Sequence, residues 1–361
     1  MTTRAALRVG LRVAGTWGAL ALGTLSAFGQ AATKPRVAHV EVQPHPSERR
    51  VDVLMDKLPF TSYVWPERLT KPVLFPIRTA RGALVTRGFP LEPQAGERVD
   101  HPHQVGLWFT HGDVNGVDFW NNSEARTADE RARMGTIRQV AIDAATSGPI
   151  GSLRVRHDWV MPDGSVVIRE RATYRFAGAP DRRMIDRTTV LSAAGKRVVL
   201  TDNKEGLFGL RVARALEAPS TEPVVTTDAA GRPTAVPVLS NEGVSGVYTS
   251  SQGLTGDAVW GTRARWVALA GRVGQEDVVL LMLDHPANPG SPSYWHARGY
   301  GLFAANGLGA RIFSNGKEKL DLAIEPGASA RFRHRLLILS GTFSAEQAGG
   351  AWKDFAAESQ E

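Results

Sequence analysis

The chain has 361 residues, of which 42% are hydrophobic and 22% are charged, and its formal net charge is +7 at pH 7. This composition is that of a globular protein with enough apolar residues for a large core. The absence of cysteine excludes a disulfide framework, a thiol nucleophile and any metal site built on thiolate ligands.

The N-terminus has the pattern of an export signal. Arg4, Arg8 and Arg12 precede the apolar run VAGTWGALALGTLSAFG, and small residues follow it. A positively charged start, a short apolar stretch and small residues at the cleavage site are typical of a secretory signal peptide. We therefore expect residues 1–31 to be removed and the mature protein to be periplasmic or secreted. No later stretch is long and apolar enough to predict a membrane span.

The positive charge is not concentrated in one part of the sequence. Removing the three arginines of the predicted signal lowers the net charge from +7 to +4, and the remaining Lys and Arg are scattered along the chain. Nucleic-acid-binding proteins usually show a clustered basic patch. We therefore expect no nucleic-acid partner.

Most of the remaining chain alternates apolar and polar residues with a period of two, as half-buried strands do. Gly and Pro separate these runs, and Asp163-Gly164 predicts a hairpin turn between two of them. The predicted strands are 36–43, 49–56, 151–161, 166–176, 183–192, 196–202, 265–273, 277–284, 310–314, 319–325 and 330–341.

Only two segments predict helices. One is 123–135, with Ser123 as N-cap, and the other is 344–359, where Ser344 and Gln347 have the spacing of a capping box. So many strands require two extended sheets face to face. The sequence therefore predicts an all-β fold, a large antiparallel sandwich with a short C-terminal helix, as a single domain over residues 36–357.

The stretch VDHPHQVGLWFTHGDVNGVDFWNN (99–122) holds three of the nine histidines. Pro102 should keep His101 extended, so that His101 and His103 point to the same side. The run GLWFTH predicts a strand that ends at His111. Neutral imidazole suits acid/base chemistry near neutral pH, and these three histidines could also hold one divalent metal ion. A third interpretation is a structural network in which they bond the backbone.

Other polar side chains follow predicted strands. Asp113 and Asn115 lie in the turn GDVNG, at a strand end where functional groups are often displayed. The segment TDNKEGLFGLRVA adds Lys204, Glu205 and Arg211, although an adjacent Lys-Glu pair is more often a surface ion pair.

The segment LDHPANPGSPSYWHARGYGLFAANGLG (283–309) predicts a long loop that is rich in Pro and Gly, and such loops are often functional. Aromatic faces next to Arg, His and Asn suit a sugar ring, while the alternative is aromatic packing over the sheet. Arg265 in WGTRARW either covers apolar surface or lines a cleft. The candidates from the long loop are His285, Trp295, His296, Arg298 and Tyr300.

These motifs together resemble a bacterial exported family labelled "methane oxygenase PmoA-like", a domain of unknown function. The resemblance runs from about Val37 to Trp352 and includes DHPHQVGLWFTHGDVNGVDFW, KEGLFGLRVA, VWGTRARWV and the long loop. Many members read His-Pro-His-His-Arg-Gly in the first motif, whereas Gln104 and Val105 stand here. The resemblance implies a β-supersandwich similar to the galactose-mutarotase architecture, in which carbohydrate is commonly bound on a concave sheet face.

Three functions fit these observations. The first is an exported carbohydrate-active enzyme, a lyase, hydrolase or epimerase that acts on a sugar or glycoside. The second is a non-catalytic glycan-binding module, and the third is the metal (copper) oxidase that the family label suggests. In the first case, catalytic or metal-ligating groups would come from His101, His103, His111, Glu205 and His285, and contacts to a small-molecule or oligosaccharide ligand from Asp113, Asn115, Lys204, Arg211, Arg265, Trp295, His296, Arg298 and Tyr300.

Overall fold

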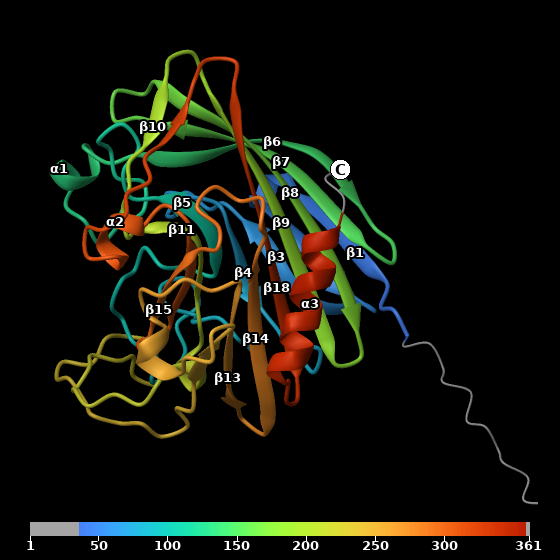
Figure 1. Cartoon of the computed structure of the whole chain (residues 1–361). Helices are drawn as coiled ribbons and strands as arrows, with labels where there is room; N and C mark the ends of the chain where they lie inside the picture. Colours follow the sequence, from blue (N-terminus) through green and yellow to red (C-terminus); the bar gives the residue numbers. More distant parts are fainter. Residues whose placement is uncertain (1–35, 359–361) are drawn as a thin grey trace, which may run out of the picture. The chain divides into compact units, whose positions relative to one another are not determined.

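The computed structural model describes residues 36–358, in which two eight-stranded antiparallel sheets pack face to face (Figure 1). The predicted all-β sandwich is therefore confirmed. The predicted signal peptide, residues 1–31, lies outside the described residues. Between residues 36 and 358, no helix is long and apolar enough to cross a membrane.

The first sheet carries the candidate site, and its strand order is β1-β2-β3-β4-β5-β11-β16-β15. Its strands are β1 (Val40–His45), β2 (Arg50–Met55), β3 (Leu58–Val64), β4 (Val73–Ile77), β5 (Leu107–His111), β11 (Gly206–Arg211), β15 (Tyr294–Arg298) and β16 (Leu302–Asn306).

The second sheet has the order β12-β13-β14-β18-β9-β8-β7-β6, and a short pair, β10 with β17, stands apart from it. The remaining strands are β6 (Thr136–Thr146), β7 (Gly151–Val160), β8 (Val166–Ala179), β9 (Arg182–Ala193), β10 (Val198–Leu200), β12 (Val247–Ser250), β13 (Trp266–Val273), β14 (Glu276–Asp284), β17 (Leu322–Ile324) and β18 (Ser329–Ser340).

The main core lies between the two sheets, because each strand turns one apolar face inward. Phe109 of β5 packs on Phe332 of β18 with ring centroids 5.4 Å apart, and Phe60 packs on Phe176 at 6.4 Å. The predicted hairpin turn at Asp163-Gly164 joins β7 to β8, with Gly164 at a φ of +85°. The outer faces of the sheets are then free to carry polar side chains.

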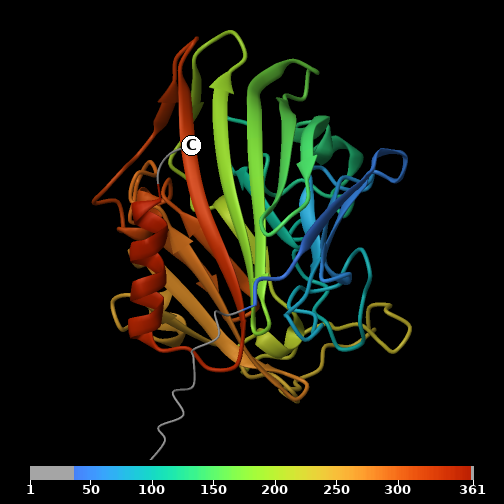
Figure 2. The ribbon, with the colours of Figure 1, turned by 90° about the vertical axis from the view of Figure 1, so that its right-hand side faces the viewer.

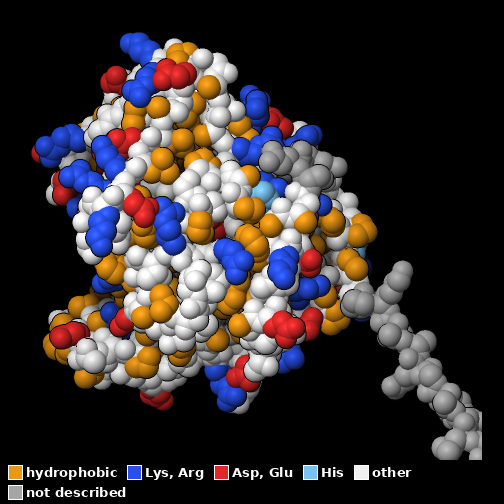
Figure 3. Space-filling model, in the orientation of Figure 1, with side chains coloured by type: hydrophobic (Ala, Val, Ile, Leu, Met, Phe, Trp, Pro, Cys, Tyr) orange, Lys and Arg blue, Asp and Glu red, His pale blue; other side chains and the backbone are white. Residues whose placement is uncertain are grey.

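The C-terminal helix α3 (Ala345–Ala357) lies along one side of the second sheet, against β13 and β14 (Figure 2). Its predicted capping box is present, because Ser344 Oγ accepts from the Gln347 amide and the Gln347 side chain accepts from the Ser344 amide. Hydrophobic, basic and acidic side chains are interspersed on the face of the molecule shown in Figure 3.

Three predictions of secondary structure are wrong. The segment 283–309, predicted as one long loop, contains the strands β15 and β16, which pair with each other. The segment 310–314 forms a short helix, α2 (Ala310–Phe313), because the Asp202 carboxylate accepts hydrogen bonds from the Arg311 amide at 3.0 and 3.1 Å. The helix predicted over 123–135 shrinks to α1 (Ala128–Arg131), which is capped by Thr127 instead of Ser123.

Candidate functional site

A cavity of about 530 Å³ opens where β15 ends and the chain turns towards β16. Two aromatic side chains, Trp260 and Tyr300, form part of its wall. Trp260 is 37% exposed, and the Arg298 guanidinium lies 5.3 Å from a ring centre of its indole. The charged and hydroxyl side chains that line the cavity are Arg98, Ser220, Thr221, Glu222, Asp257 and Arg298.

Tyr300 connects this cavity to the histidine segment. The imidazole of His101 stacks on the Tyr300 ring, with centroids 4.8 Å apart and planes 4° apart. The Arg211 guanidinium also lies 4.8 Å from the Tyr300 ring centre. The His101 side chain is 41% exposed. A ligand that extends from the cavity past Tyr300 would therefore meet an accessible imidazole.

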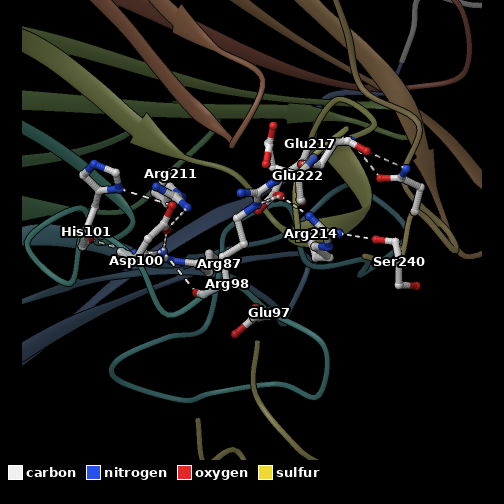
Figure 4. Close-up of polar contacts among 12 residues, drawn as sticks. Arg87, Glu97, Arg98, Asp100, His101, Arg211, Arg214, Glu217, Glu222 and Ser240 are labelled. Carbon is white, nitrogen blue, oxygen red and sulfur yellow. Dashed lines mark hydrogen bonds and ion pairs between the residues drawn. The ribbon is translucent and has the colours of Figure 1, made fainter. Parts of the chain in front are cut away.

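Two buried arginines hold the His101 segment in place (Figure 4). Arg87 and Arg211 are both fully buried, and both donate to the same carboxylate oxygen of Asp100. Arg87 also donates to the His101 carbonyl at 3.0 Å, and Arg211 donates to Gln104 Oε1 at 2.7 Å. His101 has a φ of +46° and its carbonyl accepts from the Gln104 amide, which makes the segment a turn. The expected extended backbone at His101 is therefore wrong.

The charges of this network shape its pKa values. Burial lowers the pKa of Arg87 to about 9, with a further contribution from the charge of Arg211. Burial alone would raise the pKa of Asp100, but the hydrogen bond from His101 and the charges of Arg211 and Arg87 outweigh it and hold that pKa well below its usual value. Asp100 is therefore ionised at neutral pH and neutralises part of the buried positive charge.

A second carboxylate, Glu217, positions the arginine on the cavity wall (Figure 4). Glu217 is buried and accepts from Arg98 Nε at 2.7 Å and from Arg214. Arg214 also donates to the Ser240 carbonyl at 2.6 Å. Arg98 is thereby held rigidly where it faces the cavity, which limits the entropy lost when it binds a ligand.

Two further histidines lie near His101. His103 is buried, with its ring centroid 5.7 Å from that of His101, and burial followed by the charge of Lys71 lowers its pKa far below the usual value. His296 of β15 has a pKa of about 3, lowered by burial and then by the charges of Lys204 and other basic neighbours. Both imidazoles are therefore neutral at pH 7 and have a ring nitrogen that can accept a hydrogen bond.

Glu205 and Lys204 lie next to His296. A Glu205 carboxylate oxygen is 3.9 Å from His296 Nδ1, which is also 3.2 Å from the Lys204 carbonyl oxygen. Lys204 pairs with Glu205 at 2.7 Å, and the Lys204 side chain is 48% exposed. The pair therefore borders the histidines, with its lysine open to solvent.

Lys71 is a member of this cluster that sequence reasoning missed. It is buried, its Nζ donates to the Trp120 carbonyl at 3.2 Å, and burial lowers its pKa to about 8. The charge of Lys71 acts on His103, so the two side chains share one environment. The local sequence LTKPV gives no signal for it, since a single lysine before a proline is usually exposed.

His111 does not join His101 and His103. It follows Leu107 and Phe109 on the core-facing side of β5, it is fully buried, and its Nε2 lies 2.7 Å from the Thr201 carbonyl oxygen. Within residues 36–358, no three His, Asp or Glu side chains are arranged to hold a metal ion. The structure therefore does not assemble the predicted three-histidine metal site.

Asp113 and Asn115 serve the turn after β5. The Asp113 carboxylate accepts from the Gly116 amide at 2.8 Å, and Asn115 Oδ1 accepts from the Val199 amide at 2.8 Å. Asn115 has a φ of +50°, which the turn requires. Neither residue lines the cavity beside Tyr300.

Three other candidates lie elsewhere. His285 stacks edge-on against Phe355 of α3, and its Nε2 is 2.8 Å from the Arg333 guanidinium. Arg265 lies 5.0 Å from the Trp352 ring centre on the same helix. Trp295 is fully buried in the core, and its indole N–H donates to the Ala264 carbonyl. Each of these side chains stabilises packing, so the structure does not bring them to the candidate site.

The fold and the site define an antiparallel β-sandwich protein in which a polar, aromatic-lined cavity adjoins a histidine cluster. The chain belongs to the family of unknown function DUF6807, whose model matches residues 50–353. No curated protein matches it. The methane oxygenase PmoA-like label stays a prediction.

The chain is similar to several solved structures that are only distantly related. One is the Slr1438 protein from Synechocystis sp. PCC 6803, which is 10% identical, with 85% of this chain and 97% of that chain covered and a TM-score of 0.28. Another is a galactose mutarotase-like protein from Clostridium acetobutylicum, which is 10% identical, with 84% of this chain and 98% of that chain covered and a TM-score of 0.31. A third is a galactose mutarotase related enzyme from Lactobacillus acidophilus, which is 9% identical, with 84% of this chain and 97% of that chain covered and a TM-score of 0.26. Similarities this slight carry no information on the activity of this chain.

Proposed function

We propose that the protein is a carbohydrate-active enzyme that binds a sugar or glycoside in the cavity beside Tyr300 and acts on it with His101. The observation that carries this proposal is the direct stacking of His101 on Tyr300, at 4.8 Å, because it places an imidazole next to an aromatic and polar cavity. We also propose, from the predicted signal peptide, that the protein acts outside the cytoplasm.

The cavity has the groups that a sugar needs. The C–H face of a pyranose ring stacks on an aromatic side chain, and Trp260 and Tyr300 offer two such rings. Hydroxyl groups bond to planar donors and acceptors, and Arg98, Arg298 and Asp257 provide both kinds. A volume of about 530 Å³ falls in the range of ordinary small-molecule sites.

The histidine cluster supplies groups for proton transfer. His101 is the accessible member, and Asp100 Oδ2 lies 3.2 Å from its Nδ1, which favours one orientation of the imidazole. A carboxylate behind an imidazole stabilises the positive charge that forms when the far nitrogen takes a proton. Neutral His103 and His296 can accept hydrogen bonds from hydroxyl groups of the ligand. This arrangement suits epimerisation, elimination or hydrolysis by acid/base catalysis.

The proposal is tested by ligand binding and then by product analysis. The purified mature protein is screened by thermal shift against D-glucose, D-galactose, D-glucuronate, D-gluconate and maltose, and any hit is measured by calorimetry. Arg298→Ala should weaken binding by about 1.5–3 kcal/mol, the contribution of a charged hydrogen bond. Arg232→Ala is the matched control, because the Arg232 side chain is 77% exposed and pairs with Asp228 on the surface.

His101→Ala separates an enzyme from a glycan-binding module. In an enzyme, the substitution should lower turnover by about 10²-fold or more with little change in affinity, as expected for the loss of a general acid or base. Conversion is followed by NMR of the sugar over hours. Binding without any product would support the glycan-binding module, and the absence of binding by every sugar would refute both functions.

A further inference from the structure

The outer face of the second sheet carries a dense set of arginines that the candidate site does not use. Residues at i and i+2 on a strand share a face, so the sequence RVR in β7 and the sequence RER in β8 each place two arginines outward. The strand register aligns them: Arg154 lies opposite Thr173, and Arg156 lies opposite Arg171. The basic residues that are scattered along the sequence are therefore clustered in space.

The row of cross-strand neighbours that starts with Arg154 and Thr173, and the row that starts with Arg156 and Arg171, both continue across β9 to β18. Thr173 pairs with Thr188, which pairs with Arg333, while Arg171 pairs with Val190, which pairs with Arg331. We call the surface formed by these two rows the arginine face. It comprises Arg154, Arg156, Arg171, Thr173, Thr188, Val190, Arg331 and Arg333.

The arginine face is hollowed and open. Two hollows, of about 670 and 440 Å³, share Arg154, Thr173, Thr188 and Arg331 in their linings, so they form one continuous trough. Helix α3 lies against β13 and β14, while the green and yellow-green strands β8 and β9 face the viewer in Figure 2. The trough is therefore accessible to a ligand.

The positive charge of the trough is largely unneutralised. Five arginines and two acids line the two hollows. Asp143 pairs with Arg156 at 2.8 Å, and Glu358 pairs with Arg335 at 2.7 Å and lies 4.0 Å from Arg333. Arg154, Arg171 and Arg331 form no ion pair or side-chain hydrogen bond with residues 36–358. Arg156 and Arg171 stand directly opposite each other, an arrangement that destabilises a sheet. An external polyanion would relieve this repulsion.

We propose that the arginine face binds an acidic polysaccharide, whose carboxylates or sulfates pair with the arginines and whose hydroxyls bond to the threonines. The planar guanidinium group of arginine can donate two parallel hydrogen bonds to one such oxyanion. Strands are spaced about 4.8 Å apart, so Arg154 on β7 and Arg331 on β18, which line both hollows, are separated by at least roughly 14 Å across three strand spacings. One sugar unit is too small to contact both, which favours a chain of several units.

The composition of the trough favours a polysaccharide over other polyanions. Neither hollow has an aromatic side chain in its lining, whereas proteins that bind single-stranded nucleic acid stack bases on aromatic rings. The outward apolar side chains of the lining are the small Ala144 and Val190, which offer no anchor for a lipid surface. The inference does not depend on the cavity beside Tyr300.

The test measures binding of the full mature chain to polygalacturonate at about 150 mM salt, where nonspecific surface attraction is largely screened. Neutral dextran controls for charge, and single-stranded DNA and phosphatidylglycerol vesicles represent the other polyanions. The variant R154A/R171A/R331A is compared with R81A/R131A/R133A, which removes three exposed arginines elsewhere and changes the net charge equally. Thermal melts of both variants check the fold, and removal of like charges should not lower the melting temperature of the first.

We expect wild type to bind polygalacturonate and not dextran. We expect R154A/R171A/R331A to weaken this binding by roughly tenfold or more, since one charged hydrogen bond alone contributes about a factor of ten, while the control variant binds as wild type does. Equal losses in both variants would overturn the inference, as would undetectable binding of polygalacturonate. Tighter binding of DNA or of the vesicles would overturn it in favour of those ligands.

Discussion

Asp100→Asn tests whether one shared carboxylate stabilises the two buried arginines that hold the His101 segment. In wild type, one carboxylate oxygen of Asp100 accepts from both Arg87 and Arg211, which are fully buried. The amide keeps the shape of the carboxylate but removes its charge. The substitution therefore leaves two buried guanidinium groups without their shared counter-ion, and we expect both the stability of the fold and the orientation of His101 to suffer.

The expected loss of stability in Asp100→Asn follows from the two hydrogen bonds that Arg87 and Arg211 donate to the carboxylate. Each charged hydrogen bond contributes about 1.5–3 kcal/mol, so two fully buried bonds would contribute up to about 6 kcal/mol. The Asp100 side chain is 33% exposed, and solvent screens part of this interaction. We therefore expect Asp100→Asn to lower the free energy of unfolding by about 2–4 kcal/mol.

The assay is urea unfolding of wild type, Asp100→Asn and a control, Asp228→Asn. Asp228 pairs with Arg232, whose side chain is 77% exposed, so the loss of this pair should have little effect on stability. The folded-state pKa of Asp100 lies below its usual value, so its contribution is fully present above about pH 4 and is lost as the pH falls further. Equal effects of the two substitutions at pH 7 would refute the reasoning.

Three further predictions concern buried groups. Lys71→Met should raise the free energy of unfolding at pH 7 by about 1–3 kcal/mol, because a lysine with a folded-state pKa of about 8 is costly to bury charged. Because the unfolded state binds more protons between about pH 8 and 10.4, wild-type stability should rise over this range relative to Lys71→Met in urea titrations, and parallel curves would contradict the prediction. His111→Ala should lower stability by about 2–3 kcal/mol by opening a core cavity, yet leave sugar affinity unchanged in calorimetry; a loss of affinity at unchanged stability would contradict its structural role. Gly209→Ala should be destabilising in thermal melts by more than about 1 kcal/mol, because its Cβ would approach Trp108 Cζ2 to 2.6 Å, and an unchanged melting temperature would argue against this packing.

The fold was largely predictable because its strands follow the physical rule of alternation. The run GLWFTH does form β5 with Leu107 and Phe109 facing the core. The strand predicted over 310–314 was wrong because the short apolar pattern there fits a strand and a helical turn equally well. The carboxylate of Asp202, which is distant in the sequence, accepts hydrogen bonds from the Arg311 amide and stabilises the helical turn. Local sequence carries no information on such a contact.

The site was predictable in part. Arg298 and Tyr300, which the sequence predicted as ligand contacts, both line the candidate cavity, and His101 and His103 lie close together. By contrast, His285 is the middle residue of the tripeptide Asp-His-Pro, as His101 is in the first motif, yet His285 packs against Phe355 of α3. Long-range pairing determines which sheet a strand joins. The shared tripeptide therefore could not predict that His101 and His285 lie at different sheets.

The arginine face and the burial of Lys71 also could not be predicted from the sequence. Arginines such as Arg154, Arg171 and Arg331 are far apart along the chain, and only the register of β7, β8, β9 and β18 gathers them. Lys71 acquires its lowered pKa from burial beside Trp120, which the sequence around it does not indicate.

The central claim, that the cavity and His101 form one sugar site, is tested most directly by a crystal structure of the complex with the tightest-binding sugar of the panel. We predict that a sugar ring lies against Trp260 or Tyr300 within the cavity and that one of its carbons or hydroxyls lies within about 4 Å of the His101 imidazole, the distance of direct contact. A sugar bound elsewhere on the chain, with the cavity unoccupied and His101 untouched, would contradict the account.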